Sequence, residues 1–269
     1  MKKFAFKKVY VFFSSLFIFC LHIPFVFAKA KPVDNISDNK AVLYIHTFTL
    51  TDFQMWKAIG DSACTVNLYD SLHLSTLGLN RQAYNYALKG FDVMKSEGEL
   101  NKRNIISIVD FSKPSSQKRL FVIDLDNSKL LFNTYVAHGM QSGGAFAKQF
   151  SNKPSSLKSS LGFYETLGTY IGGNGYSLRL EGVEKGINDN ANKRDIVIHG
   201  AQYVNENMIR SKGYIGRSWG CPALPERLHK AIIDVIKNGT CLFIFSPDNN
   251  YLRHSKILNQ SAGQLLAKN

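Results

Sequence analysis

The chain is poor in cysteine and tryptophan, and it lacks several patterns that define common classes of protein. It has four cysteines and two tryptophans in 269 residues. Its histidines and cysteines have no regular metal-ligand spacing, so we expect no metal site and no cofactor. It has no basic-aromatic RNA-binding motif, so no nucleic-acid partner is expected. After the N-terminal segment, no run of residues is apolar enough to span a membrane.

Internal repeats are also absent, and strand-like segments do not alternate with helices, which argues against a doubly wound fold. Up to about residue 104 the pattern is helical, with Tyr84, Leu88 and Phe91 at helical spacing after Asn80, a candidate N-cap. Short β-branched or aromatic runs follow at 105–111, 120–125, 130–137, 161–167, 176–180, 196–199 and 240–246, with one amphipathic helix that begins near Pro225. We therefore predict an α+β fold, β-rich with mixed or mostly antiparallel sheets and a helical N-terminal subdomain.

The N-terminus is typical of an exported protein. Four lysines precede an almost wholly apolar run over residues 9–28, which ends in Val26-Phe27-Ala28, a small-residue cleavage signal. We predict a signal peptide at 1–28, a flexible leader at 29–40, the helical subdomain at 41–104, the β-rich domain at 105–252 and a loose C-terminal tail at 253–269. If the leader is not cleaved, it would tether the protein to a membrane.

Cleavage would lower the net charge from +13 to +9, because it removes four lysines and no acidic residue. This charge suits an acidic cell-wall substrate. Three cysteines would remain, namely Cys64, Cys221 and Cys241, and an odd count in an oxidising compartment leaves one thiol unpaired. Cys241 lies in an apolar strand-like run and is expected to be a small buried hydrophobe. A Cys64–Cys241 disulfide is an open alternative.

A histidine and a cysteine stand at the edges of ordered elements. His199-Gly200 ends an apolar run, and Ser218-Trp219-Gly220-Cys221 follows a polar stretch. A cysteine attacks as the thiolate and needs a nearby base, which His199 can supply. The backbone amides of residues 219–221 are candidate donors to an oxyanion. The signatures of papain-like and caspase-like enzymes are missing, which argues against both families.

Several motifs together resemble the L,D-transpeptidase catalytic domain family (YkuD type), and in particular its second, murein L,D-transpeptidase subgroup. They are Ser142-Gly143, Phe150-Ser151-Asn152, residues 159–164, Ser177-Leu178-Arg179-Leu180, Ile198-His199-Gly200-Ala201 and Gly216-Arg217-Ser218-Trp219-Gly220-Cys221-Pro222-Ala223. The resemblance spans roughly residues 63 to 251. It implies a β-rich catalytic fold, export to the envelope, and peptidoglycan stem peptides as the substrate.

The resemblance also implies roles for individual residues. Cys221 would be the nucleophile, His199 the base, and the carbonyl of Gly200 would orient the imidazole, while Ser218 and Gly220 shape the oxyanion loop. Two departures stand out: Trp219 replaces a second histidine, and Pro222-Ala223 replaces an apolar residue and an arginine. The candidates for substrate binding are then Arg217, Arg179 and His138.

His138 ends a strand as His199 does, and a structural histidine is the alternative. The predicted function is an exported, periplasmic or envelope L,D-transpeptidase that forms cross-links with release of D-alanine. The alternatives are an L,D-carboxypeptidase with the same site and a non-catalytic cell-wall-binding protein. The sequence carries no signal for oligomeric state.

Overall fold

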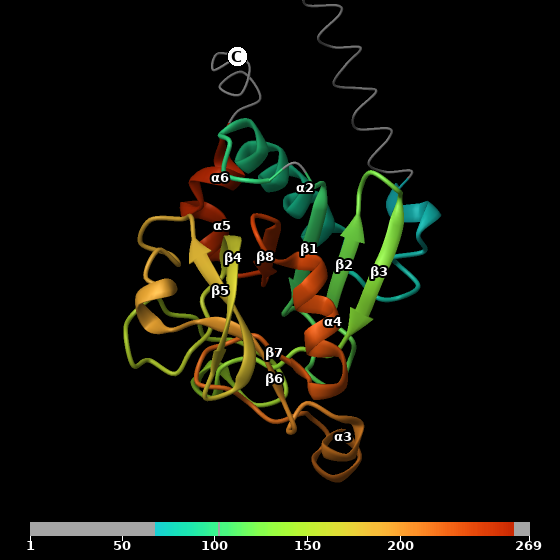
Figure 1. Ribbon diagram of the computed structural model, residues 1–269, viewed down its shortest axis with the longest axis vertical. Helices are drawn as coiled ribbons and strands as arrows, with labels where there is room; N and C mark the ends of the chain where they lie inside the picture. The colour runs from blue at the N-terminus through green and yellow to red at the C-terminus, as the bar shows by residue number, and fades with distance from the viewer. Residues whose placement is uncertain (1–67, 102, 261–269) are drawn as a thin grey trace, which may run out of the picture. The chain divides into compact units, whose positions relative to one another are not determined.

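One mixed sheet of eight strands organises residues 68–101 and 103–260, the part of the chain that the computed structural model describes (Figure 1). The strand order is β3–β2–β1–β8–β4–β5–β6–β7. The strands are β1 (Ile105–Asp110), β2 (Leu120–Asp124), β3 (Lys129–Thr134), β4 (Gly162–Gly172), β5 (Gly175–Gly182), β6 (Val197–Ala201), β7 (Ala223–Pro225) and β8 (Cys241–Phe245). The β1–β8 and β6–β7 pairs are parallel and the other pairs are antiparallel, which confirms the predicted mixed sheet.

Each apolar run identified in the sequence forms a strand, and β2 and β3 form an antiparallel hairpin. The strand β7 was missed because it has only three residues, too few for a hydrophobic period to be visible.

The two ends of the sheet are joined by the chain that follows β3. The amide of Ala137 donates to the carbonyl oxygen of Ala223 in β7 at 2.8 Å. The amide of Met140 donates to the carbonyl oxygen of Ser218 at 2.7 Å, and Gly139 forms a parallel bridge with Ser218. The sheet is therefore nearly closed, and residues 137–140 lie beside the loop that leads to Cys221.

Helices cover the sheet. They are α2 (Arg81–Ser96), α3 (Glu206–Lys212), α4 (Glu226–Ile236), α5 (Asn249–His254) and α6 (Lys256–Asn259), together with the 3-10 turns η1 (Met140–Ser142) and η2 (Asn192–Arg194). Asn80 caps α2 as predicted, because its side chain accepts from the amide of Gln82 at 2.8 Å. Contacts join α2 to β1 and β8, and α4 to β6 and β7. In Figure 1, α3 lies at the end of the sheet opposite α2.

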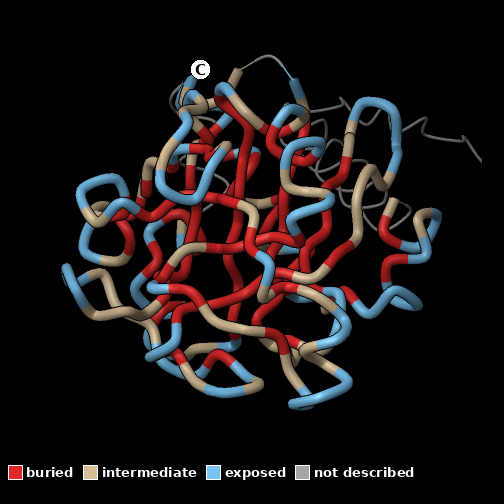
Figure 2. The backbone as a smooth tube through the Cα atoms, turned by 60° about the horizontal axis from the view of Figure 1, so that its bottom comes forward, coloured by how far each residue is buried: buried red, intermediate tan, exposed pale blue. Residues whose placement is uncertain are grey.

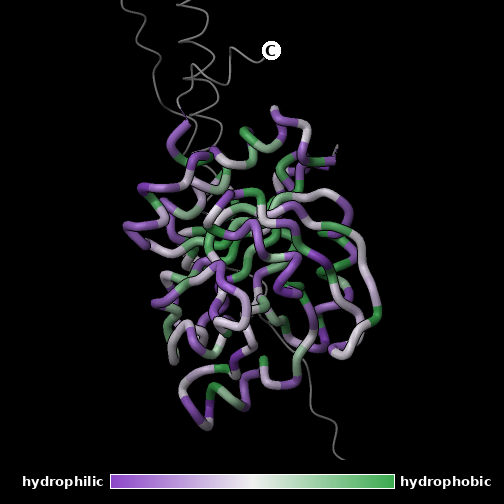
Figure 3. The backbone as a smooth tube through the Cα atoms, turned by 90° about the vertical axis from the view of Figure 1, so that its left-hand side faces the viewer, coloured by the Kyte–Doolittle hydropathy of each residue, from purple (hydrophilic) through white to green (hydrophobic). Residues whose placement is uncertain are grey.

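One core lies between these layers. The side chains of α2 that face the sheet, among them Tyr84, Leu88 and Phe91, belong to the same buried cluster as the central strands. Figure 2 shows the strands as the buried centre with exposed loops around them, and Figure 3 shows hydrophobic stretches gathered in the same interior. Cys241 is a free, fully buried thiol, as predicted, so it forms no disulfide; Cys64 lies outside the described residues.

The predicted loose tail is wrong for residues up to 260. Asp248 caps α5 and Ser255 caps α6, and the side chains of Ile257 and Leu258 are buried. These two apolar residues contribute to the core that α2 also enters, so burial orders a segment whose composition looks like a tail. The predicted leader, the first part of the helical subdomain and residues 261–269 lie outside the described residues. Within 68–101 and 103–260, no helix is both long enough and apolar enough to cross a membrane.

Candidate active site

Cys221 and His199 are brought together by the parallel pairing of β6 and β7. His199 pairs with Ala223, two residues after Cys221. The thiol of Cys221 faces the start of β6, where its Sγ lies 3.5 Å from the carbonyl oxygen of Asp195. The site therefore places a half-buried thiol against the same strand that carries the histidine.

The imidazole of His199 is held in one tautomer. Its Nδ1 lies 2.9 Å from the carbonyl oxygen of Gly200. A carbonyl can only accept, so Nδ1 carries the proton and donates it, which leaves the lone pair on Nε2 when the ring is neutral. His199 is almost fully buried, and this hydrogen bond also fixes the orientation of its ring. The ring is thus prepared to accept a proton at Nε2.

The electrostatics keep both groups neutral. Burial lowers the pKa of His199, the bond to Gly200 opposes that shift, and the nearby His229 adds to it. Burial raises the pKa of the Cys221 thiol, against the opposing effects of the Val197 amide and the Arg194 guanidinium. Both shifts favour the neutral forms, so the thiol has to lose its proton to a base in order to act as a nucleophile.

The loop before Cys221 is built around the hydroxyl of Ser218. This Oγ donates to the carbonyl oxygen of Cys221 at 2.6 Å and accepts from the amide of Gly220 at 3.1 Å. The amide of Gly220 is therefore occupied, which corrects its assignment as an oxyanion donor. Among the described residues, the amides of Trp219 and Cys221 donate to no other residue, so they remain the candidates.

Two glycines are required by close contacts. Gly220 has φ +134°, in the region that favours glycine, and a Cβ there would lie 3.0 Å from the carbonyl oxygen of Lys158. Gly200 has the ring of His229 against it, and a Cβ would lie 2.6 Å from the Nδ1 of that ring. Glycine at both positions lets neighbouring segments approach the backbone on either side of the Cys221–His199 pair.

Arg194 is a site residue that sequence reasoning missed, although it stands just before the β6 run. Its guanidinium donates to the carbonyl oxygens of Ser151 and Lys158, both at 2.7 Å, and to the hydroxyl of Ser160 at 2.6 Å. These hydrogen bonds hold the 151–160 loop in place. The positive charge of Arg194 also lowers the pKa of the Cys221 thiol, against the larger effect of burial.

Tyr203 was also missed. Its ring lies where a Cβ on Gly216 would be, and burial raises the pKa of Tyr203 to about 12. A thiolate at Cys221 would raise this pKa in the same direction. A hydroxyl near the thiol is therefore kept protonated. No spacing in the sequence points to Tyr203. Its position depends on a contact with a later part of the chain, where the amide of Gly216 donates to the carbonyl oxygen of Tyr203.

The two arginines predicted to bind substrate occupy different places. Arg179 pairs with Val197 across the β5–β6 ladder, just as Ser177 pairs with His199, so Arg179 is on the same face of the sheet as His199. Its guanidinium lies over the Tyr170 ring, 4.3 Å from the centroid, and the residue is exposed. Arg217 donates to the carbonyl oxygen of Gly143 at 3.0 Å. Both retain donors for a carboxylate.

His138 does not line an open site, which corrects its assignment to substrate binding. It is fully buried; its Nδ1 lies 2.7 Å from Nη2 of Arg119, and its Nε2 lies 3.3 Å from the carbonyl oxygen of Gly143. Burial and the charge of Arg119 lower the pKa of His138 to about 4. Both ring nitrogens are engaged, so the structural alternative holds.

Trp219 has the opposite environment, since it is 76% exposed beside Cys221. Its ring is therefore available to a ligand. Within residues 68–101 and 103–260, no group of three histidine, cysteine or acidic side chains could hold a metal ion.

A comparison with protein-family models identifies the family of the chain. The model of the L,D-transpeptidase catalytic domain matches residues 75–245, more than half of the chain. The chain belongs to the L,D-transpeptidase catalytic domain family. The match includes His199 and Cys221 and both strands that position them, and it agrees with the resemblance carried by the sequence motifs. A search of curated proteins found no match.

Solved structures of several bacterial proteins are similar at low identity. One is an L,D-transpeptidase from Mycobacterium smegmatis, at 13% identity and TM-score 0.34, over 54% of this chain and 59% of that one. Another is a variant of the helical cell shape determining protein Pgp2 from Campylobacter jejuni, at 12% identity and TM-score 0.37, over 60% and 56%. A third comes from Stackebrandtia nassauensis, at 16% identity and TM-score 0.32, over 59% and 66%. This chain spans less than two thirds of each, and the family assignment rests on the family model.

Proposed function

We propose that this protein is an exported cysteine L,D-transpeptidase that acts on peptidoglycan stem peptides. The observation that carries the proposal is the hydrogen bond from His199 Nδ1 to the Gly200 carbonyl, which leaves Nε2 as a base on the strand that the thiol faces. The family supports an L,D-transpeptidase type of chemistry on this pair.

In the first half-reaction, the Cys221 thiol transfers its proton to Nε2 of His199 while the sulfur attacks the carbonyl carbon before the terminal D-alanine. A carbon–sulfur bond forms, and the negative oxygen is stabilised by backbone amides, for which Trp219 and Cys221 are the free candidates. The intermediate then collapses, the carbon–nitrogen bond breaks, and the imidazolium protonates the departing amine of D-alanine. The product is a thioester on Cys221.

In the second half-reaction, the amine of another stem peptide attacks the thioester. His199 takes a proton from this amine, the new carbon–nitrogen bond forms, and the proton returns to the released sulfur of Cys221. The result is a cross-link and a regenerated site. If water attacks in place of the amine, the same steps release a tripeptide, which is carboxypeptidase activity.

The test is incubation of the protein with purified tetrapeptide muropeptides under reducing conditions, followed by mass spectrometry. We expect a cross-linked dimer and free D-alanine from the native sequence and neither from Cys221→Ala. A tripeptide without a dimer would show that the protein acts as a carboxypeptidase and not as a transpeptidase. Absence of both products, in a protein that is folded and reduced, would remove the enzymatic proposal and leave a wall-binding protein.

Export to the periplasm or cell envelope is part of the same proposal. It is supported by the basic and apolar N-terminal segment and by the net charge of +9 that would remain after cleavage. Cell fractionation and N-terminal sequencing test it. We expect a mature envelope protein that begins at Lys29; full-length protein confined to the cytoplasm would contradict it.

A further inference from the structure

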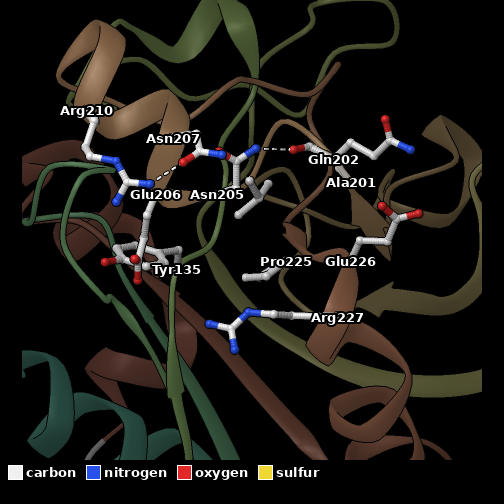
Figure 4. Close-up of a pocket in the computed structure, with 11 residues that line it drawn as sticks. Tyr135, Ala201, Gln202, Asn205, Glu206, Asn207, Arg210, Pro225, Glu226 and Arg227 are labelled. Carbon is white, nitrogen blue, oxygen red and sulfur yellow. Dashed lines mark hydrogen bonds between the residues drawn. The ribbon is translucent and has the colours of Figure 1, made fainter.

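A pocket lies where β6 and β7 end, beyond Cys221 and His199 in the chain (Figure 4). Its volume is about 650 Å³, and Ala201 and Pro225, the last residues of these two strands, line its wall. Neither Cys221 nor His199 lines it. The pocket is therefore distinct from the candidate active site in its lining residues.

The lining carries an acid and a base from each of two helices. Glu206 and Arg210 come from α3, and Glu226 and Arg227 begin α4. Within residues 68–101 and 103–260 there are two ion pairs, Arg81–Asp70 and Lys237–Asp234, and neither involves these four side chains. Two positive and two negative residues thus line one open cavity, and no ion pair joins them.

One of the four charged groups has a hydrogen-bond partner, since Arg210 donates to the side chain of Asn207. The charge of Glu206 raises the pKa of the Tyr135 hydroxyl, which also lines the pocket. The guanidinium of Arg227 and the carboxylate of Glu226 form no hydrogen bond with any described residue. Figure 4 shows Arg227 extending into the pocket toward Tyr135.

Tyr135 is influenced by charges of both signs. Burial raises the pKa of its hydroxyl, the negative charge of Glu206 adds to that effect, and the positive charge of Arg227 opposes it. The hydroxyl therefore stays protonated and can donate to a ligand carboxylate.

We propose that this pocket binds a zwitterionic amino-acid group, that is, a ligand with both a free carboxylate and a free ammonium. An anion alone would meet Glu206 and Glu226, and a cation alone would meet Arg210 and Arg227, whereas a zwitterion satisfies both sets. The fork of Arg227 suits a carboxylate, and the Glu226 carboxylate suits an ammonium.

This site goes beyond the proposed reaction, because binding there does not require Cys221. A natural source of such a ligand is the diamino-acid residue of a peptidoglycan stem, and this source, though not the site, rests on the proposed function. A stem held there would be retained by residues other than Cys221 and His199.

The probe is meso-diaminopimelate, which carries both groups, compared with pimelate, which has only the carboxylates, and cadaverine, which has only the ammonium groups. Calorimetry on the full chain of Cys221→Ala should give binding of diaminopimelate, with pimelate and cadaverine each at least about tenfold weaker. In amide-resolved NMR, the perturbed signals should come from residues 201–210 and 225–227.

Two variants and one control assign the binding to the pocket. We expect Arg227→Gln and Glu226→Gln each to weaken diaminopimelate at least about tenfold, and Arg227→Lys to retain part of the affinity. Arg253→Gln, on α5 and away from the pocket, should leave binding unchanged. Circular dichroism confirms that each variant is folded.

Three results would overturn the proposal: no binding of diaminopimelate, equal binding of pimelate or cadaverine, or equal loss in Arg253→Gln. Because the assay uses a protein without the Cys221 thiol, failure of the proposed transpeptidation leaves this result unaffected. Carbapenem labelling of the native sequence, measured in parallel, reports on the thiol chemistry alone.

Discussion

His138 and His199 each stand before a glycine at the end of an apolar run, and each has its Nδ1 in a hydrogen bond. For His199 the partner is a carbonyl, which forces Nδ1 to donate and leaves Nε2 free. For His138 the partner is the Arg119 guanidinium, which forces Nδ1 to accept and places the ring proton on Nε2, beside the Gly143 carbonyl. The partner of Nδ1, and not the local sequence, therefore separates a candidate base from a structural histidine.

The largest difference between the two histidines is expected in thiol acylation. His199→Gln removes the base and should slow acylation of Cys221 by a carbapenem by about 10²–10⁴-fold. His138→Gln should change the rate by less than about threefold once the folded fraction is taken into account. Mass spectrometry of the adduct over time measures both, and equal losses in the two variants would erase the distinction.

The pH dependence of stability sharpens the comparison. His138 has a folded pKa of about 4, below its ordinary 6.5, so the unfolded chain binds the proton more readily. Its stabilising contribution is complete above pH 6.5 and is lost as the pH falls toward 4, by up to roughly 3 kcal/mol. Urea unfolding between pH 7.5 and 4 measures this. Glutamine does not titrate, so the free energy of unfolding of His138→Gln should depend less on pH in this range. An unchanged pH dependence would contradict the prediction.

Replacing the glycine after either histidine by alanine creates a steric clash. We expect a second substitution to relieve the clash at Gly200 but not the one at Gly139. Gly200→Ala puts a Cβ against the ring of His229 and should destabilise the fold by about 1–3 kcal/mol. His229→Ala in the same chain should restore most of this loss. At Gly139 a Cβ would lie 2.5 Å from the backbone oxygen of Leu157, and truncating a side chain cannot move that atom. Leu157→Ala should therefore fail to rescue Gly139→Ala in thermal unfolding.

The smallest expected effect concerns Arg194. Arg194→Gln removes the positive charge that opposes the burial of the thiol, so the pKa of Cys221 should rise further. The pH dependence of alkylation by iodoacetamide measures this pKa. Arg179→Gln, whose guanidinium lies over the Tyr170 ring, serves as the matched control and should leave the profile in place. An equal shift in both variants would mean that net charge, and not the position of Arg194, is responsible.

Local patterns in the sequence were sufficient for much of the fold. Apolar runs bounded by turns predicted seven of the eight strands, and spacing behind Asn80 predicted α2, because each signal is contained within a few residues. The short strand β7 and the helices α5 and α6 were not visible, since pairing with β6 and burial of Ile257 and Leu258 make these segments regular.

The sequence by itself determined the chemistry available to this protein: one cysteine and one histidine with flanking glycines, in motifs specific enough to resemble the family to which the chain belongs. Only the tertiary structure decided which histidine could act as a base, that the Gly220 amide is occupied, and that Arg194 is close enough to Cys221 to lower the pKa of its thiol. These facts depend on hydrogen bonds between residues far apart in the chain, such as Arg119 with His138 and Arg194 with Lys158. No local period records such contacts, because their partners meet only when the sheet closes.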